Sequence, residues 1–427
     1  MISQRQVSAE LRYESSQSLK GYKTTPCANP CLACAAAVHS VFEACQVTRL
    51  VQPSGDDDGN IALKKKDSSP VTVGDFGAQA VALRALHGYR PDDMFISEES
   101  SDALTEDEGL CRRVLEAVNH PRGVGSEKTD RDEIIRSIDY GQGLRCSDAS
   151  AKSNRVWALD PIDGTKGFLR GRYRGGQYCI ALALIEDGEP IVAILGCPNL
   201  PTMNSTAMPN GHWSDEEVDD ANGERLFSSL RGTLFVAAKG SGCYEIPLCE
   251  IEDWLGSTSV SVGQSSWTRL EVTNSDGSIA AAQGRFCLGV ERGFSDPKGT
   301  VVEIASMICG PEGIVTDKDG VRDIKNSLRI DGQAKYGLLA RGQCEYFIRL
   351  PRKGYTDWIW DVAAGYLVLK EAGGTLTDVR GKQIDFSHIG GATRHAKLSE
   401  SVRGIFGTSG GVFHEALVNC YGEVEDV

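Results

Sequence analysis

Hydrophobic positions at helical spacing predict three helices. Residues 26–52 carry small apolar positions, and apolar residues recur at helical spacing from Asp75 to Gly88. A third helix is expected to start near Asp361 and to end at Gly373-Gly374, a common helix C-cap. The chain is therefore expected to contain long helices.

Short apolar runs between polar segments predict strands. Two of these runs flank Asp187-Gly188, which is a strong β-hairpin signal. The expected strands cover residues 94–96, 156–159, 178–185, 190–195, 234–238, 337–340 and 346–349. Because strands alternate with helices, we expect mixed α/β layers with some antiparallel pairing.

The length of 427 residues suits two domains of ordinary size. The polar stretch 201–232 is expected to hold the domain boundary or an insertion. We therefore predict an α+β domain at residues 1–228 and an α/β domain at residues 229–427. No apolar stretch approaches the roughly 20 residues that span a bilayer, so no membrane association is expected.

The formal net charge of −14 disfavours broad electrostatic capture of nucleic acid, so no nucleic-acid partner is expected. An anionic chain also repels anionic substrates at long range. A phosphate-binding site in this chain would therefore need metal ions and a few local cations.

The 14 cysteines are scattered along the chain. Because the N-terminus lacks the order of a secretory signal, we expect reduced thiols and a cytoplasmic location. Residues 1–22 are Ser-rich and carry two arginines, which leaves an organellar address open. Cys27, Cys31 and Cys34 could indicate zinc, but no second ligand cluster follows, and one side of a helix is the favoured interpretation.

Acidic residues stand at the junctions between predicted elements in three places. Glu98-Glu99 and the pair Asp160 and Asp163 each follow a strand, and Asp361 starts a helix. Converging carboxylates repel one another unless a cation lies between them, and hard oxygen ligands suit Mg²⁺. We therefore predict a site for two or three magnesium ions.

The turn after Asp160 adds further candidates. Ile162 can offer its carbonyl to a metal, Gly164 permits a tight backbone, and Thr165 falls at a helix start that favours phosphate. In a multi-metal centre that hydrolyses a phosphate ester, Asp75 and Thr165 would orient and deprotonate the attacking water.

Each candidate also has a purely structural interpretation. Asp75 alone is more often a helix N-cap, Asp361 a first-turn acid, and Thr165 a cap. Glu98-Glu99 alone is usually a solvated loop. Their joint occurrence favours a functional site.

Two motifs in this order, Asp160-Pro-Ile-Asp-Gly-Thr165 and Trp360-Asp361-Val-Ala-Ala-Gly365, resemble those of the inositol monophosphatase superfamily. Glu98-Glu99-Ser100 resembles its third motif. Other segments resemble the 3'(2'),5'-bisphosphate nucleotidases of that superfamily, namely residues 69–75, 166–170, 196–200, 333–336 and 349–351.

The resemblance implies a five-layer α/β/α/β/α sandwich of two domains with the site between them. It implies lithium-sensitive, Mg²⁺-dependent removal of the 3'-phosphate from adenosine 3',5'-bisphosphate, giving AMP, and activity of many members on the 5'-phosphosulfate. It also implies a role for Asp75 and Thr165 in activating water. The implied metal ligands are Glu98, Asp160, the Ile162 carbonyl, Asp163 and Asp361.

By the same resemblance, Lys335 and Arg349 would hold the nucleotide and supply positive charge that the chain otherwise lacks. The substrate would also meet Gly164, Thr165 and Asp361.

Two positions depart from the pattern of the relatives. Gly332 stands where many carry Ser, and residues 291–295 stand where many carry His. Gly332 can still offer its backbone, and Phe294 can stack on adenine.

Other functions stay open at this point. An inositol polyphosphate 1-phosphatase or an inositol monophosphatase would use the same metal site, and a nucleotide-sensing regulator could keep the fold without the reaction. Residues 166–170 and 333–336 favour the nucleotidase. A phosphoaspartate route needs Asp-x-Asp, whereas two residues separate Asp160 from Asp163. We expect a monomer that binds a small nucleotide.

Overall fold

The fold comes from a computed structural model. It describes residues 32–53, 62–64, 70–120, 128–142, 155–172, 175–203, 231–251, 267–273, 279–290, 299–351, 354–387 and 396–425. The predictions for Cys27, Cys31 and Phe294 lie outside these residues, as do those for most of residues 201–232.

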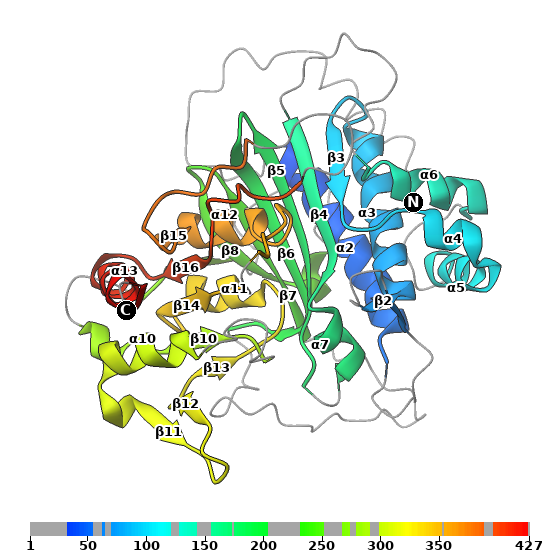
Figure 1. Cartoon of the computed structure of the whole chain (residues 1–427). Helices are drawn as coiled ribbons and strands as arrows, with labels where there is room; N and C mark the ends of the chain where they lie inside the picture. The colour runs from blue at the N-terminus through cyan, green and yellow to red at the C-terminus, as the bar shows by residue number, and fades with distance from the viewer. Residues whose placement is uncertain are drawn as a thin grey trace, which may run out of the picture.

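A seven-stranded sheet forms the centre of the molecule (Figure 1). Strands β3 and β4 are parallel, and every later neighbour pairs antiparallel. In spatial order the strands are β3 (Met94–Ser97), β4 (Arg155–Asp163), β5 (Cys179–Glu186), β6 (Glu189–Pro201), β7 (Arg231–Ala238), β8 (Gly242–Pro247) and β9 (Thr268–Leu270).

Helices cover both faces of this sheet. The long helices α2 (Leu32–Val51) and α3 (Val73–Tyr89) pack on one face, and α11 (Ala334–Ala340) and α12 (Ala363–Glu371) pack on the other. Figure 1 shows α2 and α3 in blue on one side of the green strands and α12 in orange on the other.

A second, five-stranded sheet lies beyond α11 and α12, with α10 (Thr300–Cys309) and α13 (Gly411–Glu425) on its outer side. Its strands, in spatial order, are β13 (Leu328–Arg329), β10 (Phe286–Leu288), β14 (Tyr346–Arg349), β16 (Ile405–Thr408) and β15 (Thr375–Asp378). The layers therefore follow the order α/β/α/β/α, as predicted.

Three separate apolar cores lie between these layers. Strand β5 shows why its sequence is a continuous apolar run rather than an alternating one. Ile180 and Leu182 belong to the core under α2 and α3, whereas Ala181 and Ala183 belong to the core under α11 and α12. Successive side chains point to opposite faces, and both faces of this strand are covered by helices.

The predicted hairpin at Asp187-Gly188 is confirmed, with positive φ at both residues (52° and 79°) between β5 and β6. The predicted strand at residues 337–340 is wrong, because this run belongs to helix α11. A four-residue apolar run has no period that separates a strand from a buried helix. The division at residue 228 stays a prediction of domain organisation; the seven-stranded sheet runs through it, since β7 pairs with β6.

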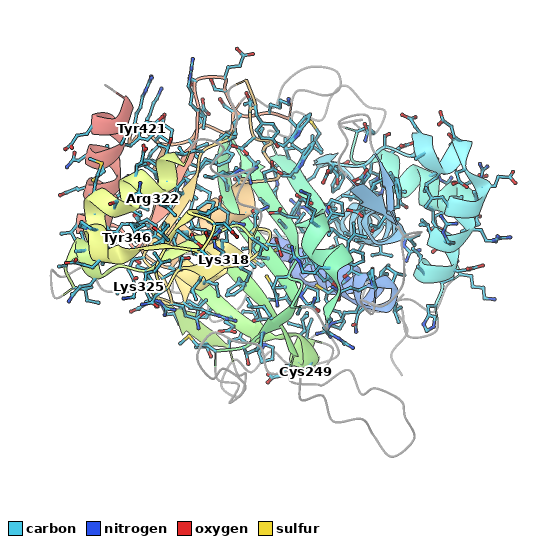
Figure 2. All side chains as sticks on the ribbon, turned by 60° about the horizontal axis from the view of Figure 1, so that its bottom comes forward. Cys249, Lys318, Arg322, Lys325, Tyr346 and Tyr421 are labelled. Atoms are coloured by element: carbon cyan, nitrogen blue, oxygen red, sulfur yellow. The ribbon has the colours of Figure 1, made fainter. Side chains whose placement is uncertain are left out.

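Smaller elements surround the layers: α4 (Asp102–Glu106), α5 (Glu108–Val118), α6 (Arg131–Asp139), α7 (Thr165–Arg170), and the hairpins β1 (Ala62–Lys64) with β2 (Pro70–Thr72) and β11 (Ile314–Thr316) with β12 (Arg322–Ile324). Lys318, Arg322 and Lys325 lie in or beside the β11–β12 hairpin (Figure 2). Among the described cysteines all are free thiols, and no described helix is both long and apolar enough to cross a bilayer.

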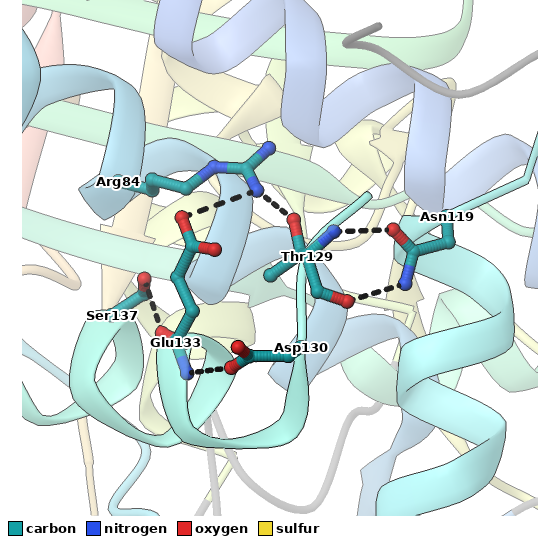
Figure 3. Close-up of polar contacts among 6 residues, drawn as sticks. All are labelled: Arg84, Asn119, Thr129, Asp130, Glu133 and Ser137. Carbon is teal, nitrogen blue, oxygen red and sulfur yellow. Dashed lines mark hydrogen bonds and ion pairs between the residues drawn. The ribbon is translucent and has the colours of Figure 1, made fainter. Parts of the chain in front are cut away.

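A polar cluster fixes the start of α6 against α3 (Figure 3). Asp130 caps α6 by accepting a hydrogen bond from Glu133 N at 2.9 Å. Asn119 binds both the N–H and the carbonyl of Thr129 at 2.8 Å, and Arg84 of α3 binds the Thr129 hydroxyl. The start of α6 therefore has a defined position against α3 and α5, and the loop that follows α6 lies behind the candidate site.

Helices α11 and α12 pack closely at Gly365, in the first turn of α12. A methyl group at this position would overlap the ring of Tyr336. We expect Gly365→Ala to lower the free energy of unfolding by about 1–3 kcal/mol, because a well-packed core tolerates extra volume poorly. Chemical denaturation would measure this. Gly422 lies in α13 with open space around it, so the control Gly422→Ala should be neutral or stabilising. Equal losses of stability for the two variants would contradict the close packing of Gly365 against Tyr336.

Candidate active site

Strand β4 contains two of the predicted acids, Asp160 and Asp163. The ladder between β4 and β5 shifts after Asp160, so that Asp160 lies opposite Ala181 and Asp163 opposite Cys179. In a regular strand, residues three apart face opposite sides of the sheet. Here β4 has one more residue than β5 between the two pairs, which is a β-bulge, and the bulge brings Asp163 to the same side as Asp160. Because Ala181 and Cys179 face the same core, Asp160 and Asp163 also face one side.

Asp160 is the electrostatic centre of the acidic cluster. Its side chain is buried, and the residue is only 2% exposed. Burial raises the pKa of Asp160 well above its usual range, and the negative charges of Glu98, Asp163, Asp361 and Asp75 raise it further. Four predicted carboxylates, three of them from other segments of the chain, are therefore near enough to Asp160 to raise its pKa.

Asp75 is part of the helix cap and also lies near the acidic cluster. Thr72 is the N-cap of α3, and Asp75 completes a capping box with it. Thr72 N and Oγ1 donate to Asp75 Oδ2 at 2.8 and 2.6 Å. The cap orients the carboxylate close enough to Asp160 to raise the pKa of that residue.

The end of β4 and the turn after it are held by local hydrogen bonds. Ile162 N donates to Asp160 Oδ1 at 3.1 Å, and Thr165 Oγ1 donates to the Ile162 carbonyl at 3.2 Å. Gly164 precedes α7 with φ 94°, which a residue with a side chain rarely adopts. The predicted metal carbonyl and the predicted hydroxyl are therefore neighbours.

Asp361 lies beside a cation of the second sheet. Arg349 Nη2 is 2.5 Å from Asp357 Oδ1 and 3.5 Å from Asp361 Oδ2. Burial opposes the charge of Arg349, but the two carboxylates together raise its pKa. Burial also raises the pKa of Asp361, and Arg349 opposes that shift. Arg349 is thus already paired with acids at the site.

Lys335 is buried at the start of α11. Its Nζ donates to the Gly332 carbonyl at 2.6 Å. Burial lowers the pKa of Lys335, while the charge of Asp163 raises it. Gly332 has φ 65°, and a methyl group there would overlap the Asp163 carbonyl oxygen. Lys335 and Gly332 therefore lie near Asp163.

Gln333 is a residue whose role was missed in the sequence. Its amide nitrogen donates to the Trp360 carbonyl at 2.8 Å, and its amide oxygen accepts from Gly365 N at 3.0 Å. Burial raises the pKa of Asp163, and the Gln333 side chain opposes that shift. The motif Gln-Ala-Lys-Tyr contained this residue, but a polar side chain before a short helix gives no sign of bridging two acidic segments.

Among the described residues, no three acidic, histidine or cysteine side chains already stand together as a ligand shell for a metal. The chemistry of the donors nevertheless fits a hard cation. The groups whose charges raise the pKa of the buried Asp160 are all carboxylates, and a divalent ion would neutralise their negative charge.

Comparisons with known proteins identify the family and the fold. The chain is 35% identical to a 3'(2'),5'-bisphosphate nucleotidase of Emericella nidulans, over 80% of this chain and 87% of the relative. It is 32% identical to the 3',5'-bisphosphate nucleotidase AHL of Arabidopsis thaliana, over 84% and 87%. The structure of the extragenic suppressor protein suhB from Bartonella henselae shares the fold, with a TM-score of 0.51, 15% identity, and coverage of 91% and 97%. The model of the inositol monophosphatase family matches residues 30–407, and this chain belongs to that family.

Proposed function

We propose that this chain is a phosphatase that removes the 3'-phosphate of adenosine 3',5'-bisphosphate, and of its 5'-phosphosulfate, in a reaction that depends on Mg²⁺. The observation that carries the proposal is the convergence of Asp75, Glu98, Asp163 and Asp361 on the buried Asp160. The nucleotidase names of the relatives support the choice of substrate.

In this proposal two or three magnesium ions would be held by Glu98, Asp160, the Ile162 carbonyl, Asp163 and Asp361. When bound, such ions supply a water of lowered pKa and stabilise the leaving oxygen. The capping box keeps one oxygen of Asp75 on Thr72 and so fixes the direction of the carboxylate that would accept a proton from the water. The Thr165 hydroxyl would orient the same water.

The nucleotide would lie on the side of Gly332. Gly164, Thr165 and Asp361 would border the 3'-phosphate, and Phe294 remains the proposed stacking partner of adenine. Lys335 and Arg349 would provide the local positive charge that a chain of net charge −14 needs for an anionic substrate. We further propose a lithium-sensitive, monomeric, cytoplasmic enzyme.

Phosphate release with Mg²⁺ from three substrates tests the proposal. Adenosine 3',5'-bisphosphate should be the best of the three, ahead of inositol 1,4-bisphosphate and inositol 1-phosphate. A preference for either inositol phosphate would move the protein to the inositol phosphatases of its family. Binding of the nucleotide without turnover at saturating Mg²⁺ would identify a sensor.

Lys335→Met should weaken the nucleotide pocket without removing the carboxylates. We expect KM for adenosine 3',5'-bisphosphate to rise about tenfold, since a hydrogen bond to a charged group contributes about 1.5–3 kcal/mol. KM for a small phosphomonoester should change much less. The matched control Lys325→Met removes an exposed lysine beside the β11–β12 hairpin (Figure 2) and should leave both constants unchanged. An equal rise for both substrates would assign Lys335 to holding Asp163 rather than to the nucleotide.

A further inference from the structure

A buried hydrogen-bond network lies behind the acidic cluster, centred on Gln79 of α3. Gln79 is 0% exposed. Its amide nitrogen donates to the carbonyls of Glu99 at 2.7 Å and Ile138 at 3.0 Å. Its amide oxygen accepts from Glu99 N at 3.0 Å and from Ser97 Oγ at 2.6 Å. The amide thus donates two hydrogen bonds and accepts two. Because the Glu99 N–H is a donor, the side of the amide that faces it must be the oxygen, which fixes the orientation of the amide.

Ser97 extends this network to the central strand. Its hydroxyl lies 2.6 Å from Gln79 Oε1 and 2.9 Å from the Leu159 carbonyl. A hydroxyl has one proton, and both neighbours are acceptors, so the proton is shared between them. Ser97 thereby holds the end of β3 against the residue that precedes Asp160.

The network joins three segments that carry acids. Gln79 lies one helical turn after Asp75, on the same side of α3. Ser97 and Glu99 lie on either side of Glu98, and both are bound by Gln79. Leu159 directly precedes Asp160 in β4. One buried amide and one hydroxyl therefore connect the backbone positions of Asp75, Glu98 and Asp160.

The loop after α6 closes the network from behind. Ser97 N donates to the Gly141 carbonyl at 2.8 Å, and Gln142 Nε2 donates to the Glu99 carbonyl at 2.7 Å. A methyl group at Gly141 would lie 2.7 Å from Ser97 Cβ. The backbone on both sides of Glu98 therefore has little freedom to move away from Asp160.

We propose that Gln79 and Ser97 are positioning residues that hold Glu98 beside Asp160 and so set the affinity of the site for divalent cations. This inference rests on the magnesium site proposed above. Carboxylates that repel one another tend to separate, and the network opposes that separation through the backbone, without contributing a ligand. Hydrogen-bond partners of metal ligands typically change metal affinity or activity 10- to 100-fold when they are replaced.

The experiment compares Ser97→Ala with Ser40→Ala. Both serines are buried, and both substitutions delete one hydroxyl; Ser40 Oγ binds only within α2, to the Ala36 carbonyl at 2.8 Å. Calorimetric titration of the EDTA-treated protein with Mn²⁺ gives metal affinity without turnover. We expect Ser97→Ala to weaken Mn²⁺ binding about tenfold and to raise the half-saturating Mg²⁺ concentration for phosphate release to a similar extent. Ser40→Ala should leave both unchanged.

Gln79→Glu provides the second variant, since it keeps the shape and the accepting oxygen but loses both donors. It should weaken Mn²⁺ binding at least as much as Ser97→Ala. Thermal unfolding in EDTA shows whether each variant is folded. If both variants bind Mn²⁺ as tightly as Ser40→Ala does, the positioning role is overturned. If the wild type itself neither binds Mn²⁺ nor needs a divalent cation, the proposed magnesium site is overturned instead.

Discussion

Asp160→Asn is expected to lower Mg²⁺-dependent phosphate release by about three orders of magnitude. Four other acids raise the pKa of Asp160, and in the proposed site its loss would remove a central metal ligand. Metal ions contribute several kcal/mol of transition-state stabilisation, and each factor of ten in rate corresponds to about 1.4 kcal/mol. Phosphate release at saturating Mg²⁺ is the measurement.

The same substitution should stabilise the protein in EDTA. Burial and four neighbouring carboxylates raise the pKa of Asp160 in the folded state, whereas an unfolded Asp titrates near 4. The stability that the neutral carboxyl contributes is therefore fully present below about pH 4 and is lost as pH rises through the folded-state pKa. Asparagine imitates the neutral carboxyl and should remove this loss.

Thermal unfolding in EDTA between pH 5 and 8 checks that expectation. The melting temperature of the wild type should fall more steeply with pH than that of Asp160→Asn. Asp319→Asn, on the exposed tip of the β11–β12 hairpin, controls for the loss of one negative charge. An Asp160→Asn protein that keeps near-normal turnover, or that melts earlier than wild type in EDTA, would contradict the central place of this carboxylate.

The acidic half of the site could be predicted because its signals are local. Asp163 ends β4 and Asp361 shortly precedes α12, while Asp160 lies within β4 directly after the apolar run 156–159. What the local pattern lacks is the bulge that turns Asp163 to the face of Asp160, since a bulge depends on the pairing of β4 with β5. The chemistry of the acidic residues suggested that they lie near one another, whereas their arrangement depends on the pairing of the strands.

The polar support of the site could not be predicted for a related reason. Gln79 and Gln333 are uncharged residues within or beside helices, where most such side chains face water. Their role arises from partners that are remote in sequence: Glu99 is 20 residues from Gln79, and Gly365 is 32 residues from Gln333. Lys335 differs from its expected environment in another way. A lysine is usually exposed to water, whereas the structure places Lys335 in the interior.

A buried ion pair between Arg341 and Glu245 is expected to contribute strongly to stability. Arg341 follows α11, and its side chain is 0% exposed; the side chain of Glu245, in β8, is 2% exposed. Arg341 Nη2 lies 2.5 Å from Glu245 Oε1, which also accepts from Met203 N and Thr233 Oγ1. Arg341→Met would leave a buried carboxylate without its cation, which costs about 3–5 kcal/mol. Urea unfolding would measure the loss.

The double substitution Arg341→Met with Glu245→Gln distinguishes the effect of an unpaired buried charge on stability from the effect of lost side-chain packing. In the described part of the structure Arg341 Nε and Nη1 and Glu245 Oε2 have no hydrogen-bond partner, so desolvation of the pair is incompletely compensated. Replacing both charges should therefore recover most of the stability that the single substitution loses, because no unpaired charge then remains in the interior. Urea unfolding of the double variant checks this. A double variant as unstable as Arg341→Met would instead show that the guanidinium matters through its packing over the Phe235 ring, 5.0 Å away, where it joins α11 to the central sheet.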